Sequence, residues 1–242
     1  KGLSDGKNFQ TTLYSLAQIF SLLATTMFAI NFVMITRIKL IQDSFGGLDK
    51  MYKIHQLNGK SAFLFILFHP ILLILTSYPN IIQTTKLMFS FSHWPLNFGI
   101  IALTLLTILI VLTIYSKMKY SNWKISHKFM GVVFIIALFH IFRIGSDIGK
   151  YPLLKYYMVF IAIIGITAFV YGVLLGRFLK KRHFYYIESI SNKNNISIIK
   201  LRPKDKKLIY SPGQFIFIKV IDKQVTKEQH PFTISSSPLE DC

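Results

Sequence analysis

Four histidines form two pairs with nearly the same spacing. His55 and His69 lie 14 residues apart, and His127 and His140 lie 13 apart, each pair in a hydrophobic segment. An ionisable side chain inside a bilayer is costly and usually marks a functional site, and imidazole is an axial ligand of haem iron. At 1.5 Å per residue, each spacing is a rise of roughly 20 Å. The pattern predicts two stacked haem sites, each with one histidine from each segment.

The residue types alone also leave roles without haem open for the four histidines. The histidines could instead be interior polar groups that hydrogen-bond to the backbone or to one another. A zinc site would need ligands that cluster more closely. The chain has one cysteine, Cys242, and no C-x-x-C-H motif, which argues against covalent haem and iron–sulfur centres.

Helix geometry supports one of the two pairs better than the other. At 3.6 residues per turn, 14 residues return to within about 40° of the starting face, whereas 13 leave an offset of roughly 140°. His127 and His140 therefore share a face only if their helix is distorted or if His127 lies at its start. Ser126 favours a start there, because serine is a common N-cap. Pro70, next to His69, is expected to loosen the other helix.

The elements that must position these histidines are apolar segments. The chain has 242 residues, of which 52% are hydrophobic, and a helix needs about 20 residues to cross a bilayer. The second and fourth segments, which carry the histidines, have apolar cores of only about 14 residues. We predict an all-α membrane bundle with about five spans here and six in the full-length protein. The expected spans are 12–36, 57–77, 98–115, 129–144 and 154–176.

The net charge of +18 reflects basic loops rather than a nucleic-acid surface. By the positive-inside rule, these loops and the C-terminal tail lie in the cytoplasm. His55 and His127 then form an inner pair, and His69 and His140 an outer pair. The same rule puts the N-terminus of this chain outside. The sequence begins with Lys1 rather than Met, as a fragment would, and one further helix upstream would bring the true start back to the cytoplasm. The basic residues of these loops and of the start of the tail are Arg37, Lys39, Lys50, Lys53, Lys117, Lys119, Lys124, Lys128, Arg177, Lys180, Lys181 and Arg182.

The tail changes character after Arg182. Residues 184–191 and 195–202 alternate apolar and polar side chains, and 214–220 forms a third apolar run, which predicts strands. Turns are expected at 193–195 and 211–213. We therefore predict two domains, a di-haem helical domain over 1–182 and the start of an antiparallel β-barrel over 183–242.

Two tail motifs carry a family resemblance. Ser-Pro-Gly-Gln-Phe-Ile-Phe at 211–217 and His-Pro-Phe-Thr-Ile-Ser-Ser-Ser-Pro at 230–238 resemble the flavin-binding barrel of the ferredoxin-reductase-like fold. The four histidines resemble the membrane domain of ferric reductases and NADPH oxidases. The resemblance implies two b-type haems, with the inner and outer pairs as iron ligands, and an FAD site. The implied FAD contacts are Gln214, His230, Pro231, Phe232, Thr233, Ser235 and Ser236.

The resemblance implies a transmembrane oxidoreductase. Electrons would pass from cytoplasmic NAD(P)H through FAD and the haems to ferric iron or dioxygen outside. The family's nicotinamide-binding domain has no counterpart in this sequence. Arg143 would meet a haem propionate or serve as an interfacial anchor, and His93 is an interface residue or an acceptor contact.

Two rival functions fit parts of the pattern. The first is a haem-containing electron-transfer subunit that serves a separate partner enzyme. The second is a non-redox membrane protein such as a transporter, which would show no Soret band. Under the preferred hypothesis the protein is integral to the plasma membrane with a cytoplasmic flavin domain. It contacts lipid, haem, flavin and a small-molecule or ferric acceptor.

Overall fold

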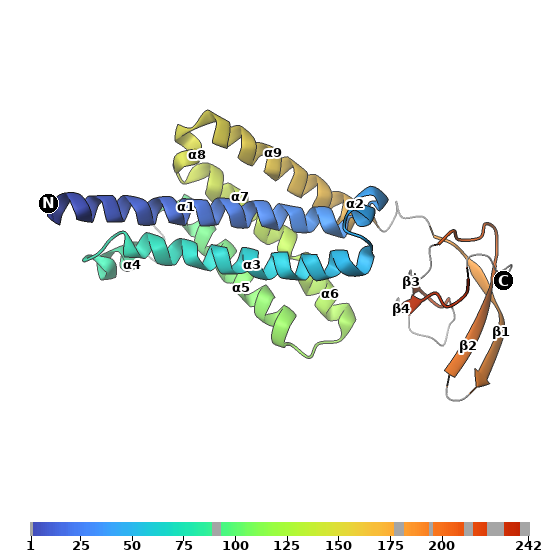
Figure 1. Ribbon diagram of the computed structural model, residues 1–242. Helices are drawn as coiled ribbons and strands as arrows, with labels where there is room; N and C mark the ends of the chain where they lie inside the picture. The colour runs from blue at the N-terminus through green and yellow to red at the C-terminus, as the bar shows by residue number, and fades with distance from the viewer. Residues whose placement is uncertain are drawn as a thin grey trace. The chain divides into compact units, whose positions relative to one another are not determined.

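The chain divides into two compact units, Lys1–Arg177 and Phe178–Cys242. A computed structural model describes residues 2–88, 93–176, 182–193, 196–210, 215–221 and 230–237. The first unit is helical and the second contains the strands (Figure 1).

Five stretches of the first unit are long and apolar enough to cross a membrane. This finding confirms the predicted helical membrane bundle. The stretches are Lys7–Ile35, Leu48–Leu75, Trp94–Tyr115, Tyr120–Arg143 and Pro152–Leu175. The helices are α1 (Gly2–Ile35), α2 (Lys39–Ser44), α3 (Leu48–Leu75), α4 (Ile81–Met88), α5 (Trp94–Tyr115), α6 (Tyr120–Lys128), α7 (Met130–Arg143), α8 (Asp147–Lys150), α9 (Pro152–Phe169) and a π-helical turn η1 (Val170–Leu175).

The two histidine-bearing spans are longer than their apolar cores suggest. Helix α3 begins at Leu48, nine residues before the expected start at residue 57, and the fourth span begins at Tyr120 rather than 129. Both additions carry polar side chains that interior packing or a membrane interface can accommodate. Helix α3 continues through Pro70 without ending there. Hydropathy alone underestimates such spans, because it counts every polar residue as a break.

The fourth span is interrupted between its two histidines. Helix α6 ends at Lys128 and α7 begins at Met130, with Phe129 between them. The expectation that Ser126 caps a helix starting beside His127 is wrong, because Ser126 lies inside α6 and its hydroxyl donates to the Trp123 carbonyl. The 13-residue spacing is therefore accommodated by a distortion of the helix.

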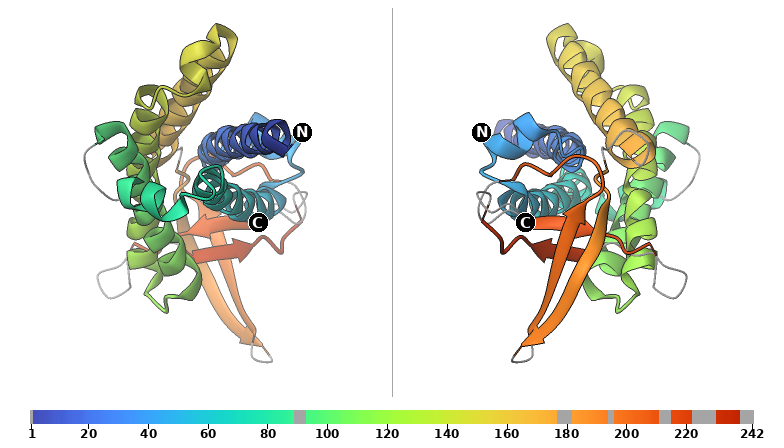
Figure 2. Two further views of the ribbon diagram at one scale, coloured as in Figure 1. Left: turned by 90° about the vertical axis from the view of Figure 1, so that its left-hand side faces the viewer. Right: turned by 90° about the vertical axis from the view of Figure 1, so that its right-hand side faces the viewer.

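Packing within the unit is organised in helix pairs. Helix α1 lies along α3 and also contacts α9, and α5 lies along α7. Figures 1 and 2 show α1 and α3 side by side. The core contains Phe32, Phe134 and Leu138. At Gly165 a Cβ would lie 2.6 Å from the Phe134 ring, so only glycine lets the ring approach α9 so closely.

The second unit contains two separate antiparallel strand pairs, which confirms the predicted start of an antiparallel flavin domain. Strand β1 (Tyr185–Lys193) pairs with β2 (Ile196–Pro203), and β3 (Phe215–Ile218) pairs with β4 (His230–Thr233). The expected turn at 211–213 lies outside the described residues, as do residues 194 and 195 of the first turn.

Candidate functional site

The inner histidines face one another from different helix pairs. The ring centroids of His55 on α3 and His127 on α6 lie 6.3 Å apart, with the ring planes at 65°. Both side chains are half-buried. The two helices come from different parts of the bundle, since α3 lies along α1 and has no extensive contact with α6. The two rings therefore meet from helices that share no extensive backbone contact.

The separation of the inner rings fits two imidazoles bound to one metal. An imidazole nitrogen binds a metal at about 2.0–2.1 Å. Ring bonds of about 1.33 Å place the ring centroid roughly 1.1 Å behind that nitrogen. Two imidazoles on opposite sides of one metal therefore have centroids roughly 6.3 Å apart. The inner pair meets this distance and fits a bis-histidine haem.

The outer histidines form a second pair at another depth. His69 on α3 and His140 on α7 lie within electrostatic reach of one another. His69 Nδ1 lies 2.8 Å from the Ala17 carbonyl, and His140 Nδ1 lies 2.7 Å from the Pro95 carbonyl. A carbonyl only accepts, so each Nδ1 carries the proton and donates it. Each Nε2 then keeps its lone pair for a metal, which is the usual arrangement of a metal-ligating histidine.

Helices α1 and α5 hold the histidines from outside. On helix α1, the Ala17 carbonyl accepts a hydrogen bond from His69, and the Asn31 backbone is hydrogen-bonded to the His55 side chain. Helix α5 offers the Pro95 carbonyl to His140, and its Thr113 hydroxyl lies 3.4 Å from His127 Nδ1. Each histidine-bearing span is thus supported by the helix that packs along it.

A glycine lets α5 approach the outer site. A Cβ added at Gly99 would lie 2.7 Å from two atoms of the His140 ring, a distance that real Cβ atoms essentially never show. The ring packs against the bare backbone one turn after its partner Pro95. Only glycine permits this contact without moving the imidazole.

A polar cluster beside His55 joins α1 to α3. The side-chain amides of Asn31 and Asn58 lie 2.9 Å apart, and the Asn58 amide donates to the Met27 carbonyl at 2.7 Å. Asn31 is buried, at 8% exposure. Buried polar groups need such partners. The cluster fixes α1 against α3 one turn after His55.

The remaining predicted membrane residues lie apart from these contacts. Arg143 is exposed and forms the last residue of α7, three residues after His140. His93 is exposed and precedes α5, where its carbonyl accepts from the Leu96 and Asn97 amides. Within the described part of the chain, no group of three or more His, Cys, Asp or Glu side chains gathers as a metal site. A bis-histidine haem needs only two.

The tail residues of the predicted flavin site lie on and after β4. His230, Pro231, Phe232 and Thr233 form β4, and its register places Phe232 opposite Ile216. All four are exposed. Ser235 and Ser236 follow the strand, while Gln214 lies outside the described residues.

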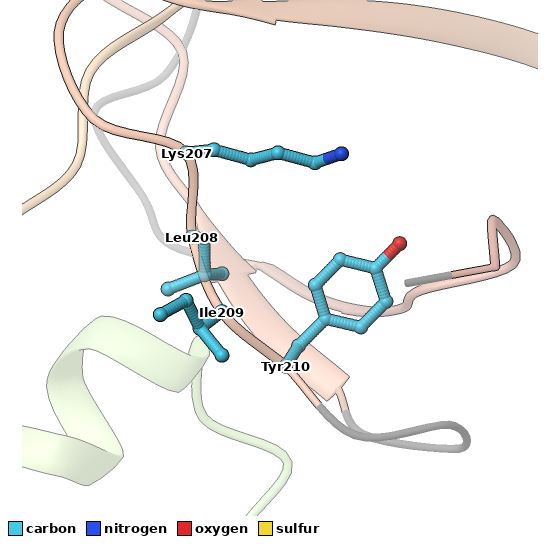
Figure 3. A pocket seen from close by; sticks show the side chains of 4 residues that line it. All are labelled: Lys207, Leu208, Ile209 and Tyr210. Carbon is cyan, nitrogen blue, oxygen red and sulfur yellow. The ribbon is translucent and has the colours of Figure 1, made fainter. Parts of the chain in front are cut away.

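Tyr210 fixes the segment after β4, a contact that the sequence did not reveal. Its hydroxyl lies 2.9 Å from Ser236 Oγ and donates to the Ser236 and Ser237 carbonyls at 3.1 and 3.0 Å. Tyr210 also lines a pocket of about 140 Å³ with Lys207, Leu208 and Ile209. Figure 3 shows the Lys207 and Tyr210 side chains extending to the same side of the chain. The pocket is smaller than the roughly 300–1,000 Å³ of ligand sites, so it does not hold FAD by itself.

Comparison with known proteins matches both units. Residues 20–138 match the family described as ferric reductase like transmembrane component, and residues 182–242 match an FAD-binding domain. The chain joins a ferric reductase-like transmembrane component to an FAD-binding domain. The first match contains His55, His69 and His127 and ends two residues before His140. The second contains every residue predicted to contact flavin.

Curated relatives of this ferric reductase-like chain come from yeast. The chain is 29% identical over 115 residues to the ferric/cupric reductase transmembrane component 7 of Saccharomyces cerevisiae, in strains YJM789 and ATCC 204508 / S288c. The alignment covers 46% of this chain and 17% of each relative. The chain thus matches about a sixth of the length of these relatives.

Proposed function

We propose that this chain is the electron-conducting part of a transmembrane oxidoreductase. The observation that carries the proposal is the approach of the His55 and His127 rings from α3 and α6, and the electrostatic interaction of His69 with His140 further along the same two spans supports it. His55 and His127 hold the inner haem, and His69 and His140 hold the outer haem. When bound, the two b-type haems and FAD supply one-electron transfer and hydride acceptance, respectively.

The histidines do more than bind iron. Because Nδ1 of His69 and His140 donates to a backbone carbonyl, both rings are held in one tautomer and orientation. An imidazole fixed in this way reorganises little when the charge at the iron changes. No side chain needs to act as an acid or a base at the outer site, so the protein orients the groups and sets their potentials.

The electron donor and the direction of transfer follow from the second unit and the charge pattern. The FAD-binding domain follows the last span, and the basic loops support a cytoplasmic location for it by the positive-inside rule. We propose NAD(P)H as the reductant, which passes a hydride to the flavin. The flavin contacts are Gln214, His230, Pro231, Phe232, Thr233, Ser235 and Ser236, within a domain that begins near residue 183.

Ferric iron is the acceptor that the relatives favour. Their name describes ferric/cupric reductases, and the family model that matches residues 20–138 is a ferric reductase like transmembrane component. The acceptor would meet the outer side, where Arg143 and His93 are exposed. Parallel assays of ferrous iron and superoxide on the full-length protein in plasma-membrane vesicles distinguish this acceptor from dioxygen.

Substitution of the outer histidines tests the proposal. His69→Ala or His140→Ala removes the outer haem, halves the reduced-haem absorbance and abolishes acceptor reduction. His93→Ala serves as the control for haem absorbance alone, because His93 is exposed and belongs to neither proposed haem pair. Unchanged haem absorbance in His69→Ala and His140→Ala protein would contradict the assignment.

A further inference from the structure

A cluster of cations and phenols joins α3, α6 and the segment between α1 and α2, beside the inner histidines. The Arg37 guanidinium carbon lies 5.6 Å from the centroid of the Tyr52 ring, and Arg37 also hydrogen-bonds the Tyr52 side chain. The Lys124 ammonium lies 6.0 Å from the Tyr120 ring centroid. Tyr52 and Tyr120 interact electrostatically, as do Lys124 and Arg37.

The cluster sits directly beside the inner histidines. Tyr52 precedes His55 by three residues on α3, and Lys124 precedes His127 by three residues on α6, so each lies one helical turn toward the cytoplasm. Trp123 stacks on the His127 ring at 5.2 Å and on Tyr120 at 5.6 Å, which fixes this part of α6. A cation thus lies one turn from each inner histidine: Arg37, through Tyr52, on the His55 side, and Lys124 on the His127 side.

The electrostatics of the cluster call for an anion. Lys124 interacts unfavourably with both Arg37 and Lys128. Like charges brought together beside an apolar bundle repel one another, and a bound carboxylate or phosphate removes that repulsion. Guanidinium and phenol donors suit carboxylate oxygens well.

We propose that Arg37 and Lys124, with the Tyr52 hydroxyl, bind the propionate carboxylates of the haem held by His55 and His127. This inference rests on the proposed function. One cation lies on the His55 side and the other on the His127 side, and a porphyrin carries two carboxylates on one edge. The inner haem is thereby bound both at its iron, by the two histidines, and at its propionates, by the cluster. Arg143, which lies at the outer end, has no part in this contact.

Haem with blocked carboxylates tests the proposal directly. Apo-protein of the full chain in detergent is loaded with protohaem or with its dimethyl ester, and loss of each haem to an acceptor protein is followed by absorbance. Protohaem dissociates from the inner site at least roughly tenfold more slowly than the ester, because charge-assisted hydrogen bonds are lost in the ester. Arg37→Gln with Lys124→Gln removes that difference. Lys39→Gln, which removes a charge from the same end outside the cluster, preserves it.

A redox titration gives a second readout that does not depend on folding yield. A cation beside a haem stabilises the reduced state, which carries one more negative charge. Lys124→Gln therefore lowers the midpoint potential of one haem and leaves the other unchanged, and Lys124→Arg restores it. Two bound haems with equal ester and protohaem dissociation would overturn this inference alone. Absence of a Soret band in unsubstituted protein would instead overturn the proposed function.

Discussion

The inner and outer histidine pairs are held by different kinds of contact. In the outer pair, both rings donate to backbone carbonyls, those of Ala17 and Pro95, at 2.8 and 2.7 Å. In the inner pair, His127 meets the Thr113 hydroxyl at 3.4 Å and stacks on Trp123. A backbone acceptor is supplied by helix position and does not depend on the identity of its own side chain. A hydroxyl or an aromatic ring depends on one residue.

This difference means that the two sites are open to change by different means. The outer site is set by how α1 and α5 pack, so it responds to substitutions that alter backbone approach. At the inner site, His55 has a backbone bond at Asn31, but His127 is held by the side chains of Thr113 and Trp123, so single substitutions there can adjust the potential and affinity of the site. Two sites of the same ligand type can in this way be tuned separately within one bundle.

The largest expected effect is at Gly99. Gly99→Ala places a methyl group 2.7 Å from the His140 ring, which displaces the imidazole and breaks its bond to Pro95. We expect loss of about half of the bound haem, all of it from the outer site, measured as pyridine haemochrome per chain. Gly149→Ala is the matched control, since nothing lies within 4 Å of a Cβ there. Selective loss of the inner haem in Gly99→Ala protein would contradict the assignment of His140 to the outer site.

A smaller effect is expected at Trp123. Trp123→Leu removes the ring stacked on His127, and such contacts contribute about 0.5–1.5 kcal/mol. Dissociation of the inner haem should become roughly two- to tenfold faster, with the outer haem unchanged. The chain's only other tryptophan provides the control: Trp94 is 73% exposed at the start of α5, so Trp94→Leu should alter neither haem.

The smallest effect is expected at Thr113. Its hydroxyl donates to the Leu109 carbonyl at 2.7 Å, which leaves a lone pair for the His127 N–H. Thr113→Val removes this acceptor, so the imidazole donates less electron density to iron and the ferric state is less stabilised. The inner midpoint potential should rise by about 20–60 mV, the equivalent of one hydrogen bond. Thr113→Ser should restore the original midpoint potential. A shift in the potential of the outer haem instead would contradict the assignment of His127 to the inner haem.

Much of the membrane unit could be predicted from the sequence. Hydropathy identified all five spans, because each is an almost continuous apolar run. The pairing of His55 with His127 also followed, since one intervening span makes α3 and the α6–α7 span run in the same direction. The starts of α3 and α6 were placed too late, because polar residues on the interior or interfacial face of a helix look like loop residues in a hydropathy window.

The supports of the histidines could not be predicted. The Ala17 and Pro95 carbonyls carry no side-chain signal, and their choice depends on the axial offset between neighbouring helices. The break at Phe129 contains no proline, the residue that most strongly interrupts helices. Gly99 gave a signal in principle, as a glycine in an otherwise apolar span, but its partner is 41 residues away in the chain. Tyr210 likewise reaches Ser236 across 26 residues.

Single alanine substitutions at all four histidines, each followed by a spectral redox titration of the full-length protein, test the central assignment most directly. We expect unsubstituted protein to show two haems with separate midpoints. His55→Ala and His127→Ala should each remove the same component, and His69→Ala and His140→Ala should each remove the other. If His55→Ala and His69→Ala, on one helix, removed the same component, the pairing across α3 and the α6–α7 span would be contradicted.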